Sequence, residues 1–167
     1  YHFTVDARTP PRIRAGFALA VERPWLYAIR VNGRLVDFTQ APRWFDEHMR
    51  VMKIGRYVHA GKNTVELRAP RFHMLCEVKP IYVLGDFSLA PAARGFRIVA
   101  PKPLKLGDWT AQGRPFDPHG VRYAWTLRLR SPLKAFRLKL GRWEGALARV
   151  LLDGQERGVI LHPPYEM

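Results

Sequence analysis

The sequence is poor in the residues that most often carry chemistry or cross-links. Its single cysteine, Cys76, excludes an intrachain disulfide and any Cys-x-x-Cys metal or redox motif, and is expected to be a small buried apolar residue. Its two serines, Ser88 and Ser131, lie outside any Gly-x-Ser-x-Gly elbow, which argues against a serine hydrolase. No stretch approaches the roughly 20 continuous apolar residues that cross a bilayer. We therefore expect no membrane partner.

Metal ligands and paired carboxylates are also hard to find. The six histidines are spread singly, and none has a partner at the spacing of a metal site. Neither a phosphate-binding loop nor a dinucleotide fingerprint is present, so we expect no cofactor and no metal. Glycoside hydrolysis needs two carboxyl groups roughly 5–9.5 Å apart. Asp86 and Asp108 both follow glycine, where an aspartate more often shapes a turn. We expect no catalytic residue in this chain.

Acidic residues are outnumbered two to one. The chain has 28 Lys and Arg against 14 Asp and Glu, a formal net charge of +14. Such an excess raises the possibility of a polyanionic partner. The basic residues are scattered singly, with no run of five or more, which disfavours nucleic acid. Solvated strand faces remain as one explanation, and a polyanion site remains as the other, for an acidic polysaccharide or, less favoured, for nucleic acid.

Apolar residues, 47% of the chain, recur mostly at every second position. Residues 13–21 and 136–140 show this alternation, and residues 121–129 show it most clearly, with Arg122, Arg128 and Arg130 among the intervening positions. A period of two is typical of strands with one buried face. The pattern predicts a strand in each range, with the apolar side chains in the core and the basic ones outside.

Turn signals separate these runs. Asn32-Gly33 and Asp153-Gly154 each lie between two apolar runs and predict type I′ hairpin turns, in which both central residues have positive φ. The best helical window, residues 42–52, is too polar for more than a turn or two of helix. The sequence therefore predicts an all-β protein, most simply an antiparallel β-sandwich.

Two hairpin phrases, residues 26–36 and 145–158, form a weak internal repeat. Any two hairpins look partly alike, so the repeat is also open to the reading that it is fortuitous. If it is real, the chain contains two sandwich modules. The Pro- and Gly-rich stretch between them predicts a first module over 1–90, a linker over 91–105 and a second module over 106–167.

Several phrases together resemble the galactose-binding-like β-sandwich modules of large glycoside hydrolases, those related to family 2 and to the family 106 α-L-rhamnosidases. In the first half these phrases are residues 29–34, Trp44 with Asp46, the Gly-x-Asn hairpin of residues 60–67, and residues 81–88. In the second half they are residues 106–116, 150–154 and 162–165. The resemblance implies a jelly-roll fold, and it covers roughly residues 12–165.

The resemblance also implies a function. Catalysis in these enzymes belongs to a separate (β/α)-barrel, so this chain is expected to be a non-catalytic accessory region that supports the barrel and holds part of a polysaccharide or oligosaccharide. The second module of such proteins continues beyond the Pro-Pro-Tyr phrase of residues 163–165, so we expect it to be incomplete here. Either the chain is a fragment, or the missing strands come from another segment or chain. Secretion or a periplasmic location would follow from the same resemblance. A free-standing carbohydrate-binding module is the alternative, and a basic nucleic-acid-binding domain is the weaker one.

Loop tryptophans with a polar neighbour are the candidate carbohydrate contacts, because sugar C–H faces lie against flat rings while hydroxyls pair with polar groups. The candidates are Trp44 with Asp46, Trp109 with Asp108, and Trp143 with Arg142. Burial under a loop or against a neighbouring module is the alternative for each tryptophan. Two others are not candidates: Trp125 is in phase with a predicted core stripe, and Trp25 begins a predicted strand and is expected to pack.

Overall fold

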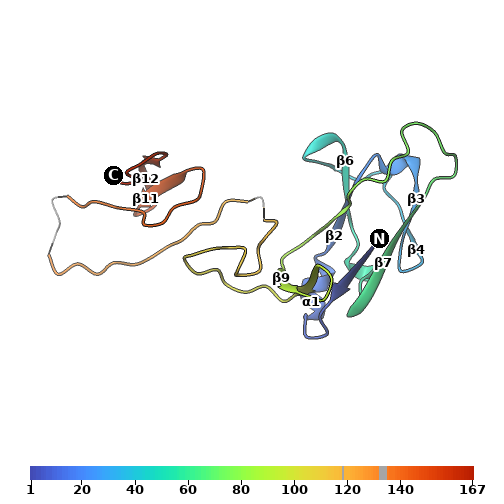
Figure 1. Cartoon of the computed structure of the whole chain (residues 1–167), viewed down its shortest axis with the longest axis horizontal. Coiled ribbons are helices and arrows are strands. Elements are labelled where there is room, and N and C mark those ends of the chain that lie inside the picture. Colours follow the sequence, from blue (N-terminus) through green and yellow to red (C-terminus); the bar gives the residue numbers. More distant parts are fainter. Residues whose placement is uncertain (118, 132–134) are drawn as a thin grey trace. The chain divides into compact units, whose positions relative to one another are not determined.

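The computed structural model describes residues 1–117, 119–131 and 135–167. The chain forms two compact units, Tyr1–Val121 and Arg122–Met167. The described part of the chain is mostly β, with one short α-helix and two 3₁₀ turns (Figure 1). None of its helices has the length and apolar character needed to span a bilayer.

The N-terminal unit contains two sheets. The six-stranded sheet has the order β4-β3-β7-β1-β10-β9, with bounds Arg34–Val36, Ala28–Val31, Gly61–Arg68, His2–Val5, Phe96–Val99 and Ser88–Pro91. The four-stranded sheet has the order β5-β6-β2-β8, with bounds Arg43–Trp44, Asp46–Lys53, Ala18–Glu22 and Tyr82–Leu84. The remaining elements of this unit are α1 (Pro11–Ala15), η1 (Pro24–Leu26) and η2 (Gly55–Tyr57). The prediction of a purely antiparallel β protein is wrong in two details, because β1 pairs with β10 in parallel and α1 is helical.

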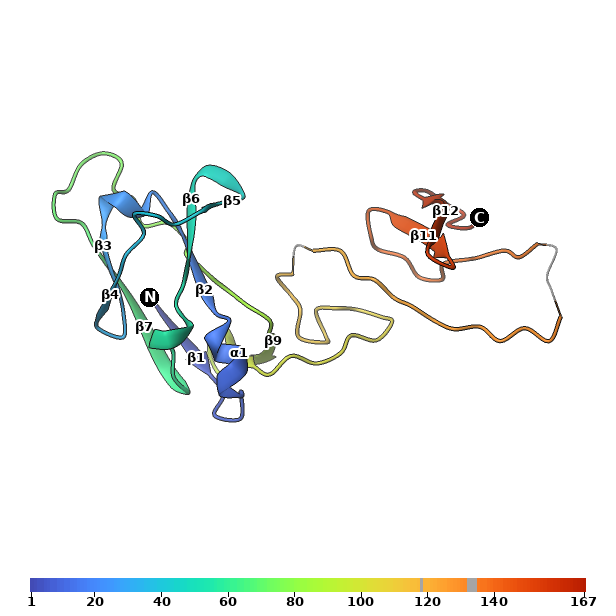
Figure 2. The ribbon, with the colours of Figure 1, turned by 180° about the vertical axis from the view of Figure 1, so that it is seen from behind.

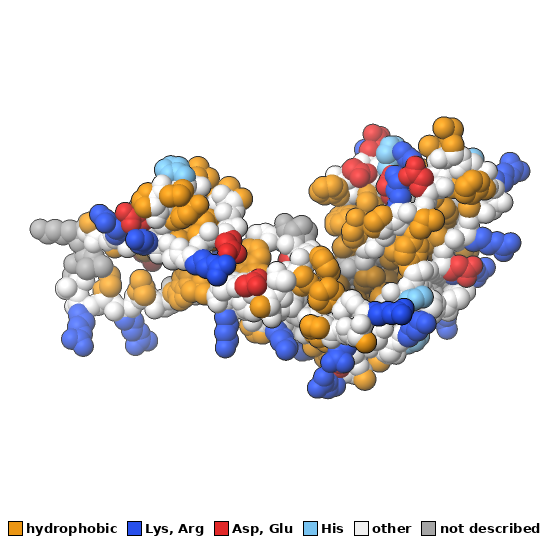
Figure 3. All heavy atoms as spheres, viewed as in Figure 1, with side chains coloured by type: hydrophobic (Ala, Val, Ile, Leu, Met, Phe, Trp, Pro, Cys, Tyr) orange, Lys and Arg blue, Asp and Glu red, His pale blue; other side chains and the backbone are white. Residues whose placement is uncertain are grey.

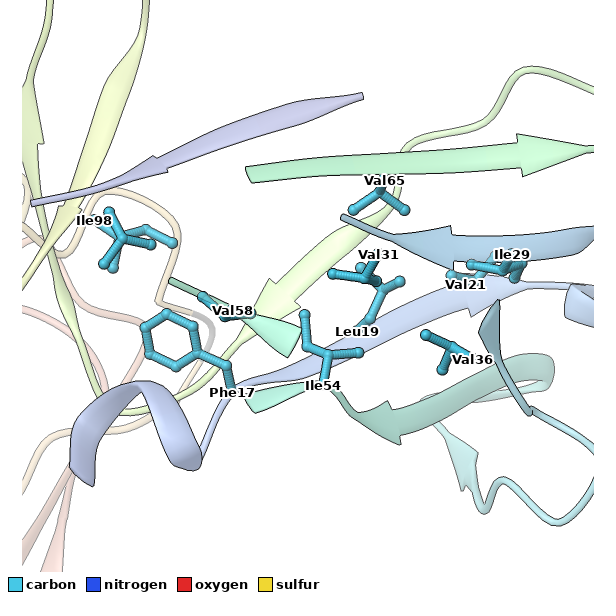
Figure 4. Packing of buried hydrophobic residues seen from close by; sticks show 11 residues of the cluster. Phe17, Leu19, Val21, Ile29, Val31, Val36, Ile54, Val58, Val65 and Ile98 are labelled. Atoms are coloured by element: carbon cyan, nitrogen blue, oxygen red, sulfur yellow. The ribbon is translucent and has the colours of Figure 1, made fainter. Parts of the chain in front are cut away.

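A single apolar cluster draws side chains from both sheets (Figure 4). The six-stranded sheet contributes side chains from β1, β3, β4, β7 and β10. The four-stranded sheet contributes side chains from β2, and the segments beside β2 and after β6 add further ones. The buried members are Val5, Phe17, Leu19, Val21, Ile29, Val31, Val36, Ile54, Val58, Val65 and Ile98. Because residues of opposite sheets meet in this cluster, their burial ties the two sheets together and fixes which face of each points inward.

The helix α1 occupies part of a range expected to be a strand. Pro11 stands at the first helical turn, where its missing N–H costs nothing, and Gly16 closes the helix. The alternation of residues 13–21 therefore predicts a strand correctly only from Ala18 onward. The opposite difference occurs at residues 42–52, where the polar window forms β5 and most of β6.

Both predicted hairpin turns have the required backbone. Asn32 and Gly33 have φ of 50° and 78°, and Asp153 and Gly154 have φ of 51° and 79°. The first pair joins β3 to β4, and the second joins β11 (Ala148–Leu152) to β12 (Gln155–Ile160). The prediction of positive φ at both central positions is confirmed.

The C-terminal unit has much less regular structure. Its one sheet within the described residues is the β11–β12 hairpin, and Lys139 forms an isolated bridge with Glu166. The strand predicted over residues 121–129 is absent, since these residues belong to no strand (Figure 2). Trp125 and Leu127 are 66% and 79% exposed. The core stripe predicted there, Trp125 included, is wrong for this chain because no neighbouring strand and no opposing layer cover it in the part of the chain that the structure describes.

The range predicted as a linker, residues 91–105, contains a strand. Residues 96–99 form β10 of the six-stranded sheet, and residues 106–121 group with the N-terminal unit. The division into two sandwich modules stays a prediction.

Candidate functional site

Three aromatic side chains gather on the four-stranded sheet of the N-terminal unit. The Trp44 ring lies 6.1 Å from the Tyr82 ring and 6.1 Å from the Phe45 ring, measured between centroids. Tyr82 and Phe45 are exposed, Phe45 to 94%, and Trp44 is partly exposed. We call Trp44, Phe45 and Tyr82 the Trp44 surface.

The strand register puts this surface on the side of the sheet that faces away from the core. Ala20 pairs with both Val51 of β6 and Tyr82 of β8, so these three side chains share one face. Leu19 and Val21, which alternate with Ala20, point into the apolar cluster. Since Trp44 contacts Tyr82, its ring lies over the outer face. Ala20 is fully buried on that same face, which is consistent with cover by large neighbours.

A tight turn positions Trp44 and Phe45 at the edge of the sheet. Trp44 of β5 pairs with Asp46 of β6, so Phe45 alone makes the turn, and its φ is 65°. A positive φ is uncommon for a bulky residue and marks local strain. The consequence here is that Phe45 projects almost entirely into solvent beside the Trp44 ring.

Asp46 is held in place by the start of its own strand. Its Oδ1 accepts hydrogen bonds from the backbone N–H groups of His48 at 2.7 Å and Met49 at 2.9 Å. These bonds, that of His48 first, hold the pKa of the carboxyl below its usual value. Asp46 is therefore a fixed anion at neutral pH, paired with Trp44 across the β5–β6 turn and able to accept hydrogen bonds from hydroxyl groups.

A second aromatic group lies on the other side of β6. The Trp25 ring is 6.2 Å from the His48 ring, and the Arg50 guanidinium lies 5.5 Å from the Trp25 centroid. His48 and Arg50 alternate with Met49 and Val51 along β6, so they point away from the Trp44 surface. Trp25 is 57% exposed, and the expectation that it packs at the start of a strand is wrong: it lies in η1.

Trp109 and Asp108 lie in a different part of the N-terminal unit. Asp108 Oδ1 accepts a hydrogen bond from the Thr110 N–H at 2.8 Å, and Gly113 in the same loop accepts one from the Leu89 N–H of β9 at 2.8 Å. The loop is thus anchored on the edge of the six-stranded sheet. β9 and the β5–β6 hairpin lie at opposite ends of the unit in both views (Figures 1 and 2). The structure gives Trp44 and Trp109 no common site.

Trp143 and Arg142 belong to the C-terminal unit. Arg142 donates two hydrogen bonds to one carboxylate oxygen of Glu144, from Nη2 at 2.7 Å and from Nε at 2.9 Å. Within the described residues the buried Trp143 indole N–H has no hydrogen-bond partner. The ring packs so closely over Gly145 that a Cβ there would lie 2.4 Å from it. Trp143 is a partly buried ring against backbone rather than an open platform.

The two loop aspartates considered as a carboxylate pair have separate partners. Asp86 pairs with Arg114 at 3.5 Å, and Asp108 caps its own turn as described above. No group of three or more potential metal ligands occurs among residues 1–117, 119–131 and 135–167. Among the candidate residues from the sequence, Trp44 is joined by the fold to further aromatic rings, those of Phe45 and Tyr82.

Sequence reasoning missed Tyr82 and Phe45. Tyr82 lies in a phrase noted above only for its likeness to rhamnosidase-like proteins, and its outward position follows from pairing with β2, which the sequence does not show. The signal for Phe45 was present: three consecutive residues, Trp44-Phe45-Asp46, combine two rings and a carboxylate.

Comparison of the chain with protein families, with curated proteins and with solved structures gives no match.

Proposed function

We propose that this chain is a non-catalytic accessory region of a glycoside hydrolase similar to the α-L-rhamnosidases, and that its N-terminal unit is a galactose-binding-like sandwich that holds part of a carbohydrate chain. The Trp44 surface carries this proposal. The phrases that resemble such enzymes support the context, and the two sheets sharing one apolar cluster support the finer fold. The role of the chain toward a catalytic barrel rests on the resemblance.

The chemistry of the Trp44 surface suits a sugar ring. The flat rings of Trp44 and Tyr82 present apolar faces against which sugar C–H groups can pack. The Asp46 carboxylate, anionic and fixed by two backbone N–H groups, supplies a hydrogen-bond acceptor for hydroxyl groups. The exposed Arg43–Glu47 pair at 3.9 Å flanks the same hairpin and adds polar groups at its rim.

The test is saturable binding of the full chain to neutral and acidic polysaccharides at low and moderate salt, with a DNA control. We expect Trp44→Ala and Tyr82→Ala each to weaken binding about two- to tenfold, because one aromatic contact contributes roughly 0.5–1.5 kcal/mol and 1.4 kcal/mol is tenfold. Trp25→Ala is the matched control: it removes an exposed tryptophan from the other side of β6 and should leave affinity unchanged.

Other outcomes discriminate between the alternatives. Loss of binding with Trp109→Ala but not Trp44→Ala would move the site to the loop beside β9. Binding to DNA alone, with an affinity that falls steeply as salt rises, would favour the nucleic-acid alternative. No saturable binding to any sugar by the folded chain contradicts carbohydrate binding and leaves a purely supporting role.

A further inference from the structure

Residues 121–130 carry the side-chain pattern of a strand without belonging to one. Trp125, Leu127 and Leu129 are 66%, 79% and 57% exposed, and the residues between them are exposed as well. Figure 3 shows Lys and Arg side chains standing singly along the C-terminal unit, with hydrophobic side chains between them. A contiguous group of large exposed apolar side chains marks an interaction surface in a soluble protein.

The backbone of this segment is open as well. Within residues 1–117, 119–131 and 135–167, residues 124–130 make no backbone–backbone hydrogen bond. Among the described residues, their N–H and C=O groups thus have no backbone partner. An extended segment whose backbone groups are unpaired with other described backbone groups, and which carries alternating apolar side chains, is a template for adding a strand.

The rest of the C-terminal unit does not cover this stripe in the described structure. Ile160 is its one buried residue among those described, and Leu151, Val159 and Leu161 of the hairpin region are exposed. A two-stranded hairpin is marginally stable by itself in water, whereas three or more strands with a shared apolar face are stable. Addition of strands to this unit would therefore stabilise it.

The charges on the segment indicate which kind of strand fits. Arg122, Arg128 and Arg130 are exposed, and in the described chain none of them forms an ion pair. A second copy, paired antiparallel so that the apolar stripes coincide, would place Arg122 opposite Arg128. Like charges directly opposite each other destabilise a strand pair, whereas opposite charges stabilise it. The pattern thus disfavours self-pairing and favours an acidic partner.

We propose that residues 121–130 form a docking strand that pairs with an extended segment of a partner protein in which apolar and acidic side chains alternate. The apolar residues of the partner would cover Trp125, Leu127 and Leu129, and its carboxylates would face Arg122, Arg128 and Arg130. Backbone pairing would supply affinity, and the charges would set the choice of partner. The proposal is independent of carbohydrate binding by the N-terminal unit.

The test uses the full chain and three peptides of about ten residues, a usual strand length. The first alternates Val and Glu, the second alternates Val and Lys, and the third has the composition of the first in two blocks. Binding is measured by tryptophan fluorescence, and the pairing site is located by amide hydrogen exchange. We expect the Val–Glu peptide to bind and to protect the amides of residues 122–130, with at least tenfold weaker binding of the other two peptides.

Two variants of the segment separate pairing from general charge attraction. Arg128→Glu combined with Arg130→Glu should reverse the preference, so that the Val–Lys peptide binds more tightly than the Val–Glu peptide. Thr126→Pro removes one backbone N–H donor from the segment and should weaken both peptides. Because the segment belongs to no strand pair among the described residues, both variants should leave the N-terminal unit folded, which hydrogen exchange in β2 and β7 checks.

Four results would overturn the proposal. The first is equal binding of the acidic and basic peptides, and the second is no peptide binding by the folded chain. The third is protection of the amides of residues 122–130 in the absence of peptide. If this protection rises with protein concentration, a second copy occupies the segment. If it does not rise, the apolar side chains are covered within one molecule. The fourth is protection of these amides by a DNA oligonucleotide and by none of the peptides.

Discussion

The buried amide of Asn63 permits a prediction whose size follows from its contacts. The side chain is fully buried in β7 and makes four hydrogen bonds. Its Oδ1 accepts from the Asn32 side-chain amide at 2.8 Å and from the His59 N–H at 3.0 Å. Its Nδ2 donates to the carbonyl oxygens of His59 at 2.8 Å and Gly61 at 3.0 Å. Asn63 therefore ties the β3–β4 turn to the segment that precedes β7.

Asn63→Ala removes all four bonds while leaving their partners in place. A buried polar group left without a partner costs about 1–3 kcal/mol. Of the groups that lose Asn63, the His59 N–H and C=O have no second partner in the described structure, while Asn32 keeps its bond to the Tyr57 carbonyl at 2.8 Å. Two such groups, partly reachable by water because His59 is exposed, predict a loss of about 2–4 kcal/mol in the free energy of unfolding.

The assay is urea denaturation of the N-terminal unit within the full chain, followed by fluorescence and by circular dichroism. Lys62→Ala is the matched control, because Lys62 is the preceding residue of the same strand and is exposed; its change should stay within about 0.5 kcal/mol. Asn63→Asp keeps the shape and the two acceptor contacts but loses both donors, so it should also destabilise. A loss below about 1 kcal/mol for Asn63→Ala would refute the conclusion that the Asn63 hydrogen bonds are a main link between the β3–β4 turn and the segment that precedes β7.

Two further predictions concern backbone packing and acid stability. Gly55→Ala would place a Cβ 2.3 Å from the Ala15 carbonyl oxygen, so it should lower the free energy of unfolding in urea by about 1–3 kcal/mol. Gly120→Ala, with open space around it, should be nearly neutral. Equal effects of the two substitutions would refute the predicted steric clash. For Asp46, whose folded pKa is lowered, the stabilisation is present above the unfolded value of about 3.9 and is lost as pH falls through the folded pKa. NMR titration of the Met49 amide should show this transition in the native chain and not in Asp46→Asn, and a titration at or above the unfolded value would contradict the hydrogen-bonded carboxylate.

The chemistry of neighbouring residues was sufficient to predict the hairpin turns. Asn-Gly and Asp-Gly tolerate positive φ at both central positions, which few other pairs do, so the turns at Asn32-Gly33 and Asp153-Gly154 follow from four residues alone. The adjacency of Trp44 and Asp46 was equally local. Tyr82 joins them only because β8 and β5 flank the same four-stranded sheet, a consequence of long-range pairing.

Alternation of side chains was a weaker guide, for a physical reason. It shows what a strand would need on each face, but a strand also needs a neighbour for its backbone and a layer for its apolar side. Residues 18–22 have both and form β2 between β6 and β8. Residues 121–129 have the cleaner pattern and neither of these partners in the described chain, so the same alternation leaves Leu127 exposed.

The sequence by itself determined the β-rich character, the hairpin turns and the closeness of Trp44 to Asp46, because these depend on residues within a few positions of one another. Only the tertiary structure decided that the six-stranded sheet contains a parallel pair and that Tyr82 completes the Trp44 surface. Each of these depends on contacts between residues distant in the chain, whose free energy outweighs local preference.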